Sequence, residues 1–193
     1  MLFLIGYDKI ITAQKGERFS MNRQELANLI FPDIIDNIAS LEARYPSRLL
    51  PHGAEVTRFA PSPTGFLHTG SLFTAMIAQK VARDSQGVFF IRLEDTDTKR
   101  EIAGSGEELL SQLAAFDVVP NEGYLGTYEK GDYGPYAQSN RAHIYKTVIK
   151  EMIVKDLAYP CFCGPEELET MRKEQEAAKV IPGYYGHYAK CRY

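Results

Sequence analysis

The chain has 193 residues, enough for one or two domains. Apolar residues make up 45% and charged residues 24%, values typical of a folded globular protein rather than a disordered one. The formal net charge of −3 excludes a uniformly basic nucleic-acid coat, although a local basic groove remains compatible with it. No apolar stretch reaches the roughly 20 residues that span a bilayer, and the apolar start lacks a basic region before it and is interrupted by Asp8 and Lys9. We therefore expect neither a membrane protein nor a signal peptide.

The N-terminal quarter predicts a small helical extension followed by a linker. Asn22 stands three residues before Glu25, the spacing of a helix capping box, and Pro32 should end or restart that helix. The proline- and glycine-containing stretch 45–53 is typical of a linker. Residues 1–53 are therefore predicted to form the extension. A second helical face within it is formed by Ile34, Ile38 and Leu41.

Residues 54–137 alternate between strand and helix patterns. Val56 to Ala60 predicts a short strand, a helix then runs to about Asp84, and Val88 to Leu93 has the length of a strand buried on both faces. Ser105 and Glu108 form a second capping-box pattern in front of an apolar helix. Strands and helices in this order indicate an α/β fold with a parallel sheet. The glycine-rich stretch 118–137 predicts a long loop.

The remaining residues, 138–193, are predicted to begin a further domain. Ser139 can cap a helix there, Tyr159 to Phe162 predicts a short strand, and Pro165 followed by two glutamates favours the first turn of another helix.

The first chemically informative run is Arg58 to Ser71, which reads RFAPSPTGFLHTGS. It forms the turn between a predicted strand and the next helix, and ligands of open parallel sheets bind beyond the carboxyl ends of such strands. Gly65 and Gly70 permit close approach of the backbone to a ligand. His68 precedes the helix N-terminus, where anions are favoured. A rigid turn with an exposed histidine is the alternative.

Two further informative runs follow this one along the chain. Residues 91–100 read IRLEDTDTKR and come directly after the second predicted strand. Taken alone, their acidic residues could form a solvated turn. The third run, residues 138–141, reads QSNR and is followed by Tyr145.

Together these runs resemble the motifs of class I aminoacyl-tRNA synthetases of the glutamyl/glutaminyl branch. The segment His68 to Ser71 stands where that class has its His-Ile-Gly-His motif, with Ser71 in place of the second histidine. The resemblance covers roughly residues 32–193. It implies a Rossmann-like first half of a nucleotide-binding domain at 54–137 and the start of an inserted tRNA acceptor-binding domain at 138–193.

The resemblance also implies roles for individual residues, with ATP and Mg²⁺ as cofactors and with glutamate and tRNA as partners. The tRNA would be the glutamate isoacceptor, or the glutamine isoacceptor as well, and the enzyme is expected to be a cytoplasmic monomer. Residues implied in catalysis are His68, Gly70 and Ser71. Residues implied in glutamate binding are Arg58, Ala60, Ser62 and Glu94. Residues implied in ATP binding are Pro63, Thr64, Gly65, His68 and Gly70. Thr96 and Asp97 are implied at the 3′ end of the tRNA.

The three cysteines form a second candidate site. An odd number in a chain without a secretory signal argues against a disulfide framework. Cys161 and Cys163, joined by the distant Cys191, would suit a tetrahedral zinc site that lacks one ligand. His187 is the better chemical fourth ligand, whereas Tyr184 matches the tyrosine of zinc-bearing members of the resembled family. Three free thiols are the alternative.

The lysine-rich phosphate-binding loop and the anticodon-binding region of such a synthetase have no counterpart in these 193 residues. We therefore expect the N-terminal portion of a glutamate–tRNA ligase, inactive on its own. Two alternatives remain: a synthetase-like enzyme that glutamylates a modified tRNA base, and a non-catalytic, zinc-stabilised interaction module. The extension before Arg58 argues against the first alternative, because such enzymes usually begin at that strand.

Overall fold

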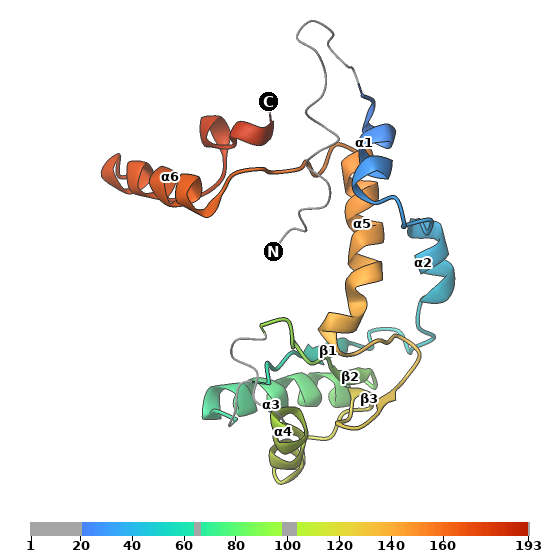
Figure 1. Cartoon of the computed structure of the whole chain (residues 1–193). Coiled ribbons are helices and arrows are strands. Elements are labelled where there is room, and N and C mark those ends of the chain that lie inside the picture. The colour runs from blue at the N-terminus through green and yellow to red at the C-terminus, as the bar shows by residue number, and fades with distance from the viewer. Residues whose placement is uncertain (1–20, 64–66, 98–103, 193) are drawn as a thin grey trace, which may run out of the picture. The chain divides into compact units, whose positions relative to one another are not determined.

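The computed structural model describes residues 21–63, 67–97 and 104–192 (Figure 1). The α-helices are α1 (Arg23–Ile30), α2 (Ile38–Arg44), α3 (Thr69–Asp84), α4 (Ser105–Ala114), α5 (Ala142–Val154) and α6 (Pro165–Ala177). The strands are β1 (Val56–Phe59), β2 (Val88–Ile91), β3 (Glu122–Tyr124) and β4 (Glu129–Lys130). Within the described residues, the short 3₁₀ helices are η2 (Gln138–Arg141), η3 (Gly186–Tyr188) and η4 (Lys190–Arg192).

The predicted parallel α/β sheet is confirmed. The strand order is β1-β2-β3-β4, and β1 pairs with β2 in parallel, with Phe59 opposite Ile91. The strand β3 continues the sheet in parallel beside β2. The carboxyl ends of β1 and β2 therefore lie next to each other, where the first two sequence motifs begin.

The prediction that residues 118–137 form a loop without regular structure was wrong. The strands β3 and β4 lie within it and pair as an antiparallel hairpin. Gly123 of β3 has a φ of +122°, and a Cβ atom there would lie 2.3 Å from the carbonyl oxygen of Ile91. A glycine inside a strand thus permits the close approach of β3 to β2, and the same glycine-rich composition suggested a loop.

The core lies between one face of the sheet and helices α3 and α4 (Figure 1). Only Phe89 and Ile91 of β2 are buried, whereas Val88 and Phe90 are half-buried, so the prediction of a strand buried on both faces was too strong. The buried members of this core are Phe59, Ala75, Ala82, Phe89, Ile91, Leu109, Leu113 and Val118.

Helix starts agree with the sequence in part. Asn22 and Glu25 form the predicted capping box of α1. Ile34 is buried as expected but precedes α2, whose capping residue is Asn37. Ser105 does not cap α4: Gly104, with a φ of +78°, is the N-cap, and the hydroxyl of the buried Ser105 has no hydrogen-bond partner among the described residues.

Two predictions for the C-terminal third were wrong. Tyr159 to Phe162 is not a strand. Ser139 lies inside η2 rather than at a helix cap, and its hydroxyl donates to Asp95 at 2.6 Å. Pro165 does occupy the first turn of α6, as predicted.

The described residues form two compact units, one within residues 33–151 and one that combines residues 21–32 with residues 152–192. Residues 33–53 lie in the same compact unit as the sheet. The predicted boundaries at 53/54 and 137/138 stay predictions. Among the described residues, no helix is long and apolar enough to cross a membrane.

Candidate active site and cysteine cluster

The strand β1 and helix α3 place the first motif at the end of the sheet. Pro61 and Pro63 are buried, whereas Ser62 is exposed. His68 is the N-cap of α3, and its exposed imidazole makes no capping hydrogen bond. A Cβ atom on Gly70 would meet nothing within 4 Å, so the first turn of α3 is open to an incoming group. Thr64 and Gly65, two predicted ATP-binding residues, lie outside the described residues.

Arg58 of β1 and Glu94, which follows the end of β2, come together at this edge of the sheet. Arg58 Nη2 lies 3.6 Å from Glu94 Oε1, and both side chains are about one third exposed, at 38% and 33%. The position of Glu94 is fixed by its backbone, whose N–H donates to the carbonyl of Pro61 at 2.8 Å. A guanidinium and a carboxylate are therefore side by side and open to solvent. This is a suitable arrangement for a ligand that carries both signs of charge.

Arg92, which the sequence analysis did not single out, also faces this site. Its Nη2 lies 3.9 Å from Glu94 Oε1, and its side chain is 20% exposed. Its Nε is buried and has no hydrogen-bond partner among the described residues. Arg92 stands inside the quoted 91–100 run, so the signal was present, but the alternation of strand side chains alone does not show that it reaches the same carboxylate as Arg58.

The acidic turn after β2 is tied to η2. Asp95 Oδ1 accepts from the Ser139 backbone N–H at 2.8 Å, and Asp95 Oδ2 accepts from the Ser139 hydroxyl. Thr96 donates to Gln138 at 3.4 Å. The second and third motifs thus meet in space, and Asp95 joins them. Thr96 and Asp97 themselves are exposed, so their side chains are accessible to a bound molecule.

The cysteines form a cluster in the other compact unit. The sulfur atoms of Cys161, Cys163 and Cys191 all lie within 4.8 Å of one another. The Cys163–Cys191 pair is 3.6 Å apart, and the hydroxyl of Tyr184 lies 3.3 Å from the Cys163 sulfur. Thiolates that share a tetrahedral zinc ion are separated by about 3.8 Å when each Zn–S bond is about 2.3 Å. The donor set and its spacing fit a zinc ion.

Tyr184, rather than His187, lies at this cluster. The Tyr184 hydroxyl accepts from the Cys191 backbone N–H at 3.1 Å. The exposed His187 instead stacks on Tyr188, with ring centroids 4.0 Å apart, and it is not among the metal-ligand groups gathered around the cysteines. The hydroxyl of Tyr184, followed by the backbone N–H of Phe162, lowers the pKa of Cys191 to about 7, which favours the thiolate that a metal requires.

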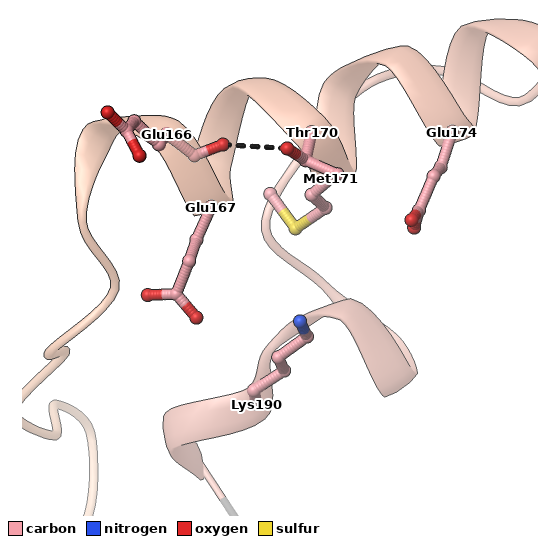
Figure 2. Close-up of a pocket in the computed structure, with 6 residues that line it drawn as sticks. All are labelled: Glu166, Glu167, Thr170, Met171, Glu174 and Lys190. Carbon is pink, nitrogen blue, oxygen red and sulfur yellow. Dashed lines mark hydrogen bonds between the residues drawn. The ribbon is translucent and has the colours of Figure 1, made fainter.

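A separate shallow pocket of about 290 Å³ lies between α6 and Lys190 (Figure 2). None of the predicted site residues lines it. The Thr170 hydroxyl donates to the Glu166 carbonyl at 2.9 Å, a bond within the helix. The lining residues are Glu166, Glu167, Thr170, Met171, Glu174 and Lys190.

Comparison with known proteins points to the same family as the motifs gathered at the end of the sheet. Residues 55–191 match the sequence model of the family described as tRNA synthetases class I (E and Q), catalytic domain. The glutamate–tRNA ligase of Clostridium beijerinckii is 48% identical over 173 residues, which cover 89% of this chain and 31% of the relative. The ligase of Acetivibrio thermocellus is also 48% identical, over 89% of this chain and 32% of its own length. The crystal structure of the glutamate–tRNA synthetase from Elizabethkingia anophelis has a TM-score of 0.62 and 39% identity, over 70% of this chain and 27% of that one.

These relatives also bear on the N-terminal extension. The chain spans about a third of the length of the curated relatives it matches. The C. beijerinckii alignment spans 173 residues of a 193-residue chain, so only about 20 residues lie outside it. That number is too small for the 31 residues 24–54 to have been left out. Residues 24–54, which the family model does not reach, are therefore matched in the C. beijerinckii ligase. The chain belongs to the class I tRNA synthetase family of E and Q enzymes, and it carries part of the catalytic domain.

Proposed function

We propose that this chain is the N-terminal part of a glutamate–tRNA ligase, which activates glutamate with ATP and transfers it to the 3′ end of tRNA. The pairing of Arg58 with Glu94 at the carboxyl ends of two adjacent parallel strands carries this proposal. It is supported by the 48% identity to ligases whose names state this activity. Because the chain spans about a third of those relatives, the activity belongs to the whole enzyme.

The charges of this site suit glutamate. Its side chain carries a carboxylate, which Arg58 can bind through two parallel N–H groups. The ammonium group of the substrate would be bound by Glu94, with the exposed Ser62 and the backbone of Ala60 beside it. In the described structure, Arg58 and Glu94 are 3.6 Å apart. A zwitterionic ligand would replace that weak contact with one partner for each charge.

The activation step needs positioning more than covalent help from the protein. An oxygen of the substrate α-carboxylate attacks the α-phosphate of ATP, the bond to pyrophosphate breaks, and glutamyl-adenylate forms. His68 would donate to the phosphates, and the N-terminus of α3 would favour their negative charge. Gly70 leaves room for the nucleotide. From the same sequence motif, this proposal assigns Pro63, Thr64 and Gly65 to ATP binding and Ser71 to catalysis. Mg²⁺ bound with ATP would supply additional neutralisation of phosphate charge.

The second step involves the exposed Thr96 and Asp97. We place the terminal adenosine of the tRNA there, so that its ribose hydroxyl attacks the activated carbonyl and AMP leaves. The tie between Asp95 and Ser139 supports this assignment, because it holds the acidic turn beside the segment that begins the acceptor-binding insertion. We also propose that the whole ligase is a cytoplasmic monomer that acts on the glutamate isoacceptor, with or without the glutamine one.

We also propose that the cysteine cluster binds zinc in a structural role. The ligands would be Cys161, Cys163, Cys191 and Tyr184, with His187 as the competing fourth ligand. The three sulfur atoms and the Tyr184 oxygen support this set. A bound zinc ion would link the two ends of residues 161–191, because Cys161 and Cys163 stand at the start and Cys191 at the end.

The test uses a completed ligase, in which residues 22–192 are joined to the remaining C-terminal part of the C. beijerinckii relative. We expect Arg58→Leu to raise the KM for glutamate, at a cost of roughly 2–4 kcal/mol in kcat/KM, because a substrate carboxylate loses its partner. The KM for ATP should change little. Formation of glutamyl-tRNA is followed with labelled glutamate.

Arg83→Leu is the matched control, because Arg83 is an exposed arginine in the last turn of α3, far along the helix from His68. Arg83→Leu should leave kcat, the KM for glutamate and the KM for ATP unchanged. A completed ligase that charges tRNA normally with Leu at position 58, or that loses ATP binding while keeping glutamate binding, would refute the assignment of Arg58. Transfer of glutamate to a modified base instead of the 3′ end would favour the base-modifying alternative.

A further inference from the structure

The extension before β1 is attached to the sheet through Arg48. The guanidinium of Arg48 donates to both carboxylate oxygens of Glu122 on β3, in one case at 2.9 Å. It also lies over the Tyr133 ring, 3.7 Å from the centroid. The Arg48 and Glu122 side chains are only 18% and 11% exposed, and the Tyr136 hydroxyl donates to the same carboxylate at 3.0 Å. A bidentate, largely buried ion pair with a third hydrogen bond is a rigid attachment.

The same extension is attached to α5 at a second place. Asp36 Oδ2 lies 2.8 Å from His143 Nε2, and Lys150 Nζ donates to the carbonyl of Ile34 at 2.6 Å. His143 and Lys150 are seven positions apart, so both lie on one face of α5. Ile34 is buried, and Arg44 donates to Asp36 at 3.2 Å. Residues 34–36 therefore follow this face of α5 across two turns.

These two attachments join α5 to the sheet by a route separate from the chain's own connection. That connection passes through residues 131–141 and is secured by the Asp95–Ser139 hydrogen bonds. The extension adds a brace from β3, through Arg48 and α2, to α5. Two separated attachments fix the direction of a helix, whereas a single attachment leaves it free to pivot. The helix α5 then leads into the segment that carries the cysteine cluster.

We propose that residues 34–48 of the extension form a brace that positions α5 for tRNA, with Asp36 and Glu122 as positioning residues that touch neither glutamate nor ATP. The proposal rests on the proposed ligase function, in which the chain after residue 138 binds the tRNA acceptor end. It assigns a role to a segment that the family model leaves out but that the C. beijerinckii ligase matches. The ligand recognised through α5 is the acceptor stem of tRNA.

The experiment measures binding of the 193-residue chain to a hairpin RNA that reproduces a tRNA acceptor stem with its single-stranded 3′ end. Asp36→Ala and Glu122→Gln each remove a negative charge, which by itself should strengthen binding to an RNA phosphate backbone. The brace predicts the opposite sign: binding weakens by about fivefold or more, the lower end of typical coupling between sites. Amide hydrogens of α5 at residues 146–151 should exchange faster, whereas those of β2 should not.

Two further variants separate positioning from folding and from charge. Asp36→Asn keeps an oxygen that accepts from His143 and Arg44, so it should retain most of the RNA affinity. Glu42→Ala is the matched control, because Glu42 is exposed on α2 and has no hydrogen bond or ion pair among the described residues. It should bind RNA as the wild type does, or slightly more tightly. Circular dichroism below the melting temperature shows that each variant is folded.

Wild-type affinity, or tighter binding, in folded Asp36→Ala and Glu122→Gln would overturn the brace while leaving the ligase proposal intact. An equal loss in Glu42→Ala would overturn it too, because the effect would then not depend on the attachment. Absence of RNA binding by the wild-type chain would count against the acceptor-binding assignment itself, and the brace would fall with it.

Discussion

Removal of zinc from the cysteine cluster should loosen the segment around α6 without affecting the sheet. Cys163 and Cys191, 28 residues apart, would be joined through the metal. If a metal link acts as a disulfide does, closing a loop of that length raises the free energy of the unfolded segment by about 3.5 kcal/mol, because it lowers the entropy of that segment. A chelator should therefore increase the opening equilibrium of this segment roughly 400-fold, since each 1.4 kcal/mol corresponds to a factor of ten.

The assay is amide hydrogen exchange of the purified chain with and without chelator, after elemental analysis has shown close to one zinc per chain. Amides of α6 report the opening, and amides of β2 and α3 in the same sample are the internal control. In Cys191→Ser, a metal still held by Tyr184 would keep a slightly shorter loop closed. The α6 amides of Cys191→Ser should then lose less protection against exchange than those of the chelated wild type. In the double variant Cys191→Ser, Tyr184→Phe, the loss of protection should equal that of the chelated wild type.

His187→Gln is the matched variant for the fourth ligand, and we expect it to keep its zinc. Loss of zinc in this variant but not in Tyr184→Phe would reverse the choice of ligand. Metal-free protein, with cysteines that react rapidly with a thiol reagent and with α6 protection that ignores the chelator, would refute the site. The synthetase family assignment does not depend on this result.

Four other predictions concern the sheet, the nucleotide-binding motif and the extension. Gly123→Ala should destabilise the chain by about 2–4 kcal/mol in urea unfolding, since it combines a positive φ with a clash against β2; a variant as stable as the wild type would contradict the described pairing of β3 with β2. In the completed ligase, His68→Ala should lower kcat by about 10²–10³-fold, and an unchanged kcat would place His68 away from the phosphates. Gly70→Ala should raise the KM for ATP. It should leave the melting temperature nearly unchanged, because the added Cβ meets no protein atom. The hydrogen bond from His143 is the largest cause that lowers the pKa of Asp36, so its stabilisation is present above the unfolded pKa of about 3.9 and is lost as the pH falls through the lower folded value. Asp36→Asn should accordingly be less stable than the wild type at pH 6, and the difference should shrink as the pH falls through the lowered folded pKa of Asp36; a difference that is independent of pH would refute this interpretation.

The sequence alone determined the features that depend on local chemistry. The capping box at Asn22, the proline in the first turn of α6 and the parallel order of β1 and β2 follow from short-range patterns. The family could also be identified from the motif that contains His68 and from the run after β2. In both motifs, the chemistry requires particular residue types at fixed spacing on one turn, so no long-range contact is needed to see them.

The tertiary structure decided the features that depend on partners far along the chain. The strands β3 and β4 could not be predicted, because Gly123 is a poor strand residue by itself and is tolerated only where its missing side chain lets β2 approach. Ser139 binds Asp95 instead of capping a helix, because a charge-assisted hydrogen bond to a distant carboxylate is available to it. The tertiary structure also showed that Arg48, in the predicted linker, contacts Glu122 of the sheet. No local pattern marks an arginine for one particular carboxylate among 25 acidic residues, so only the fold could show which pair forms.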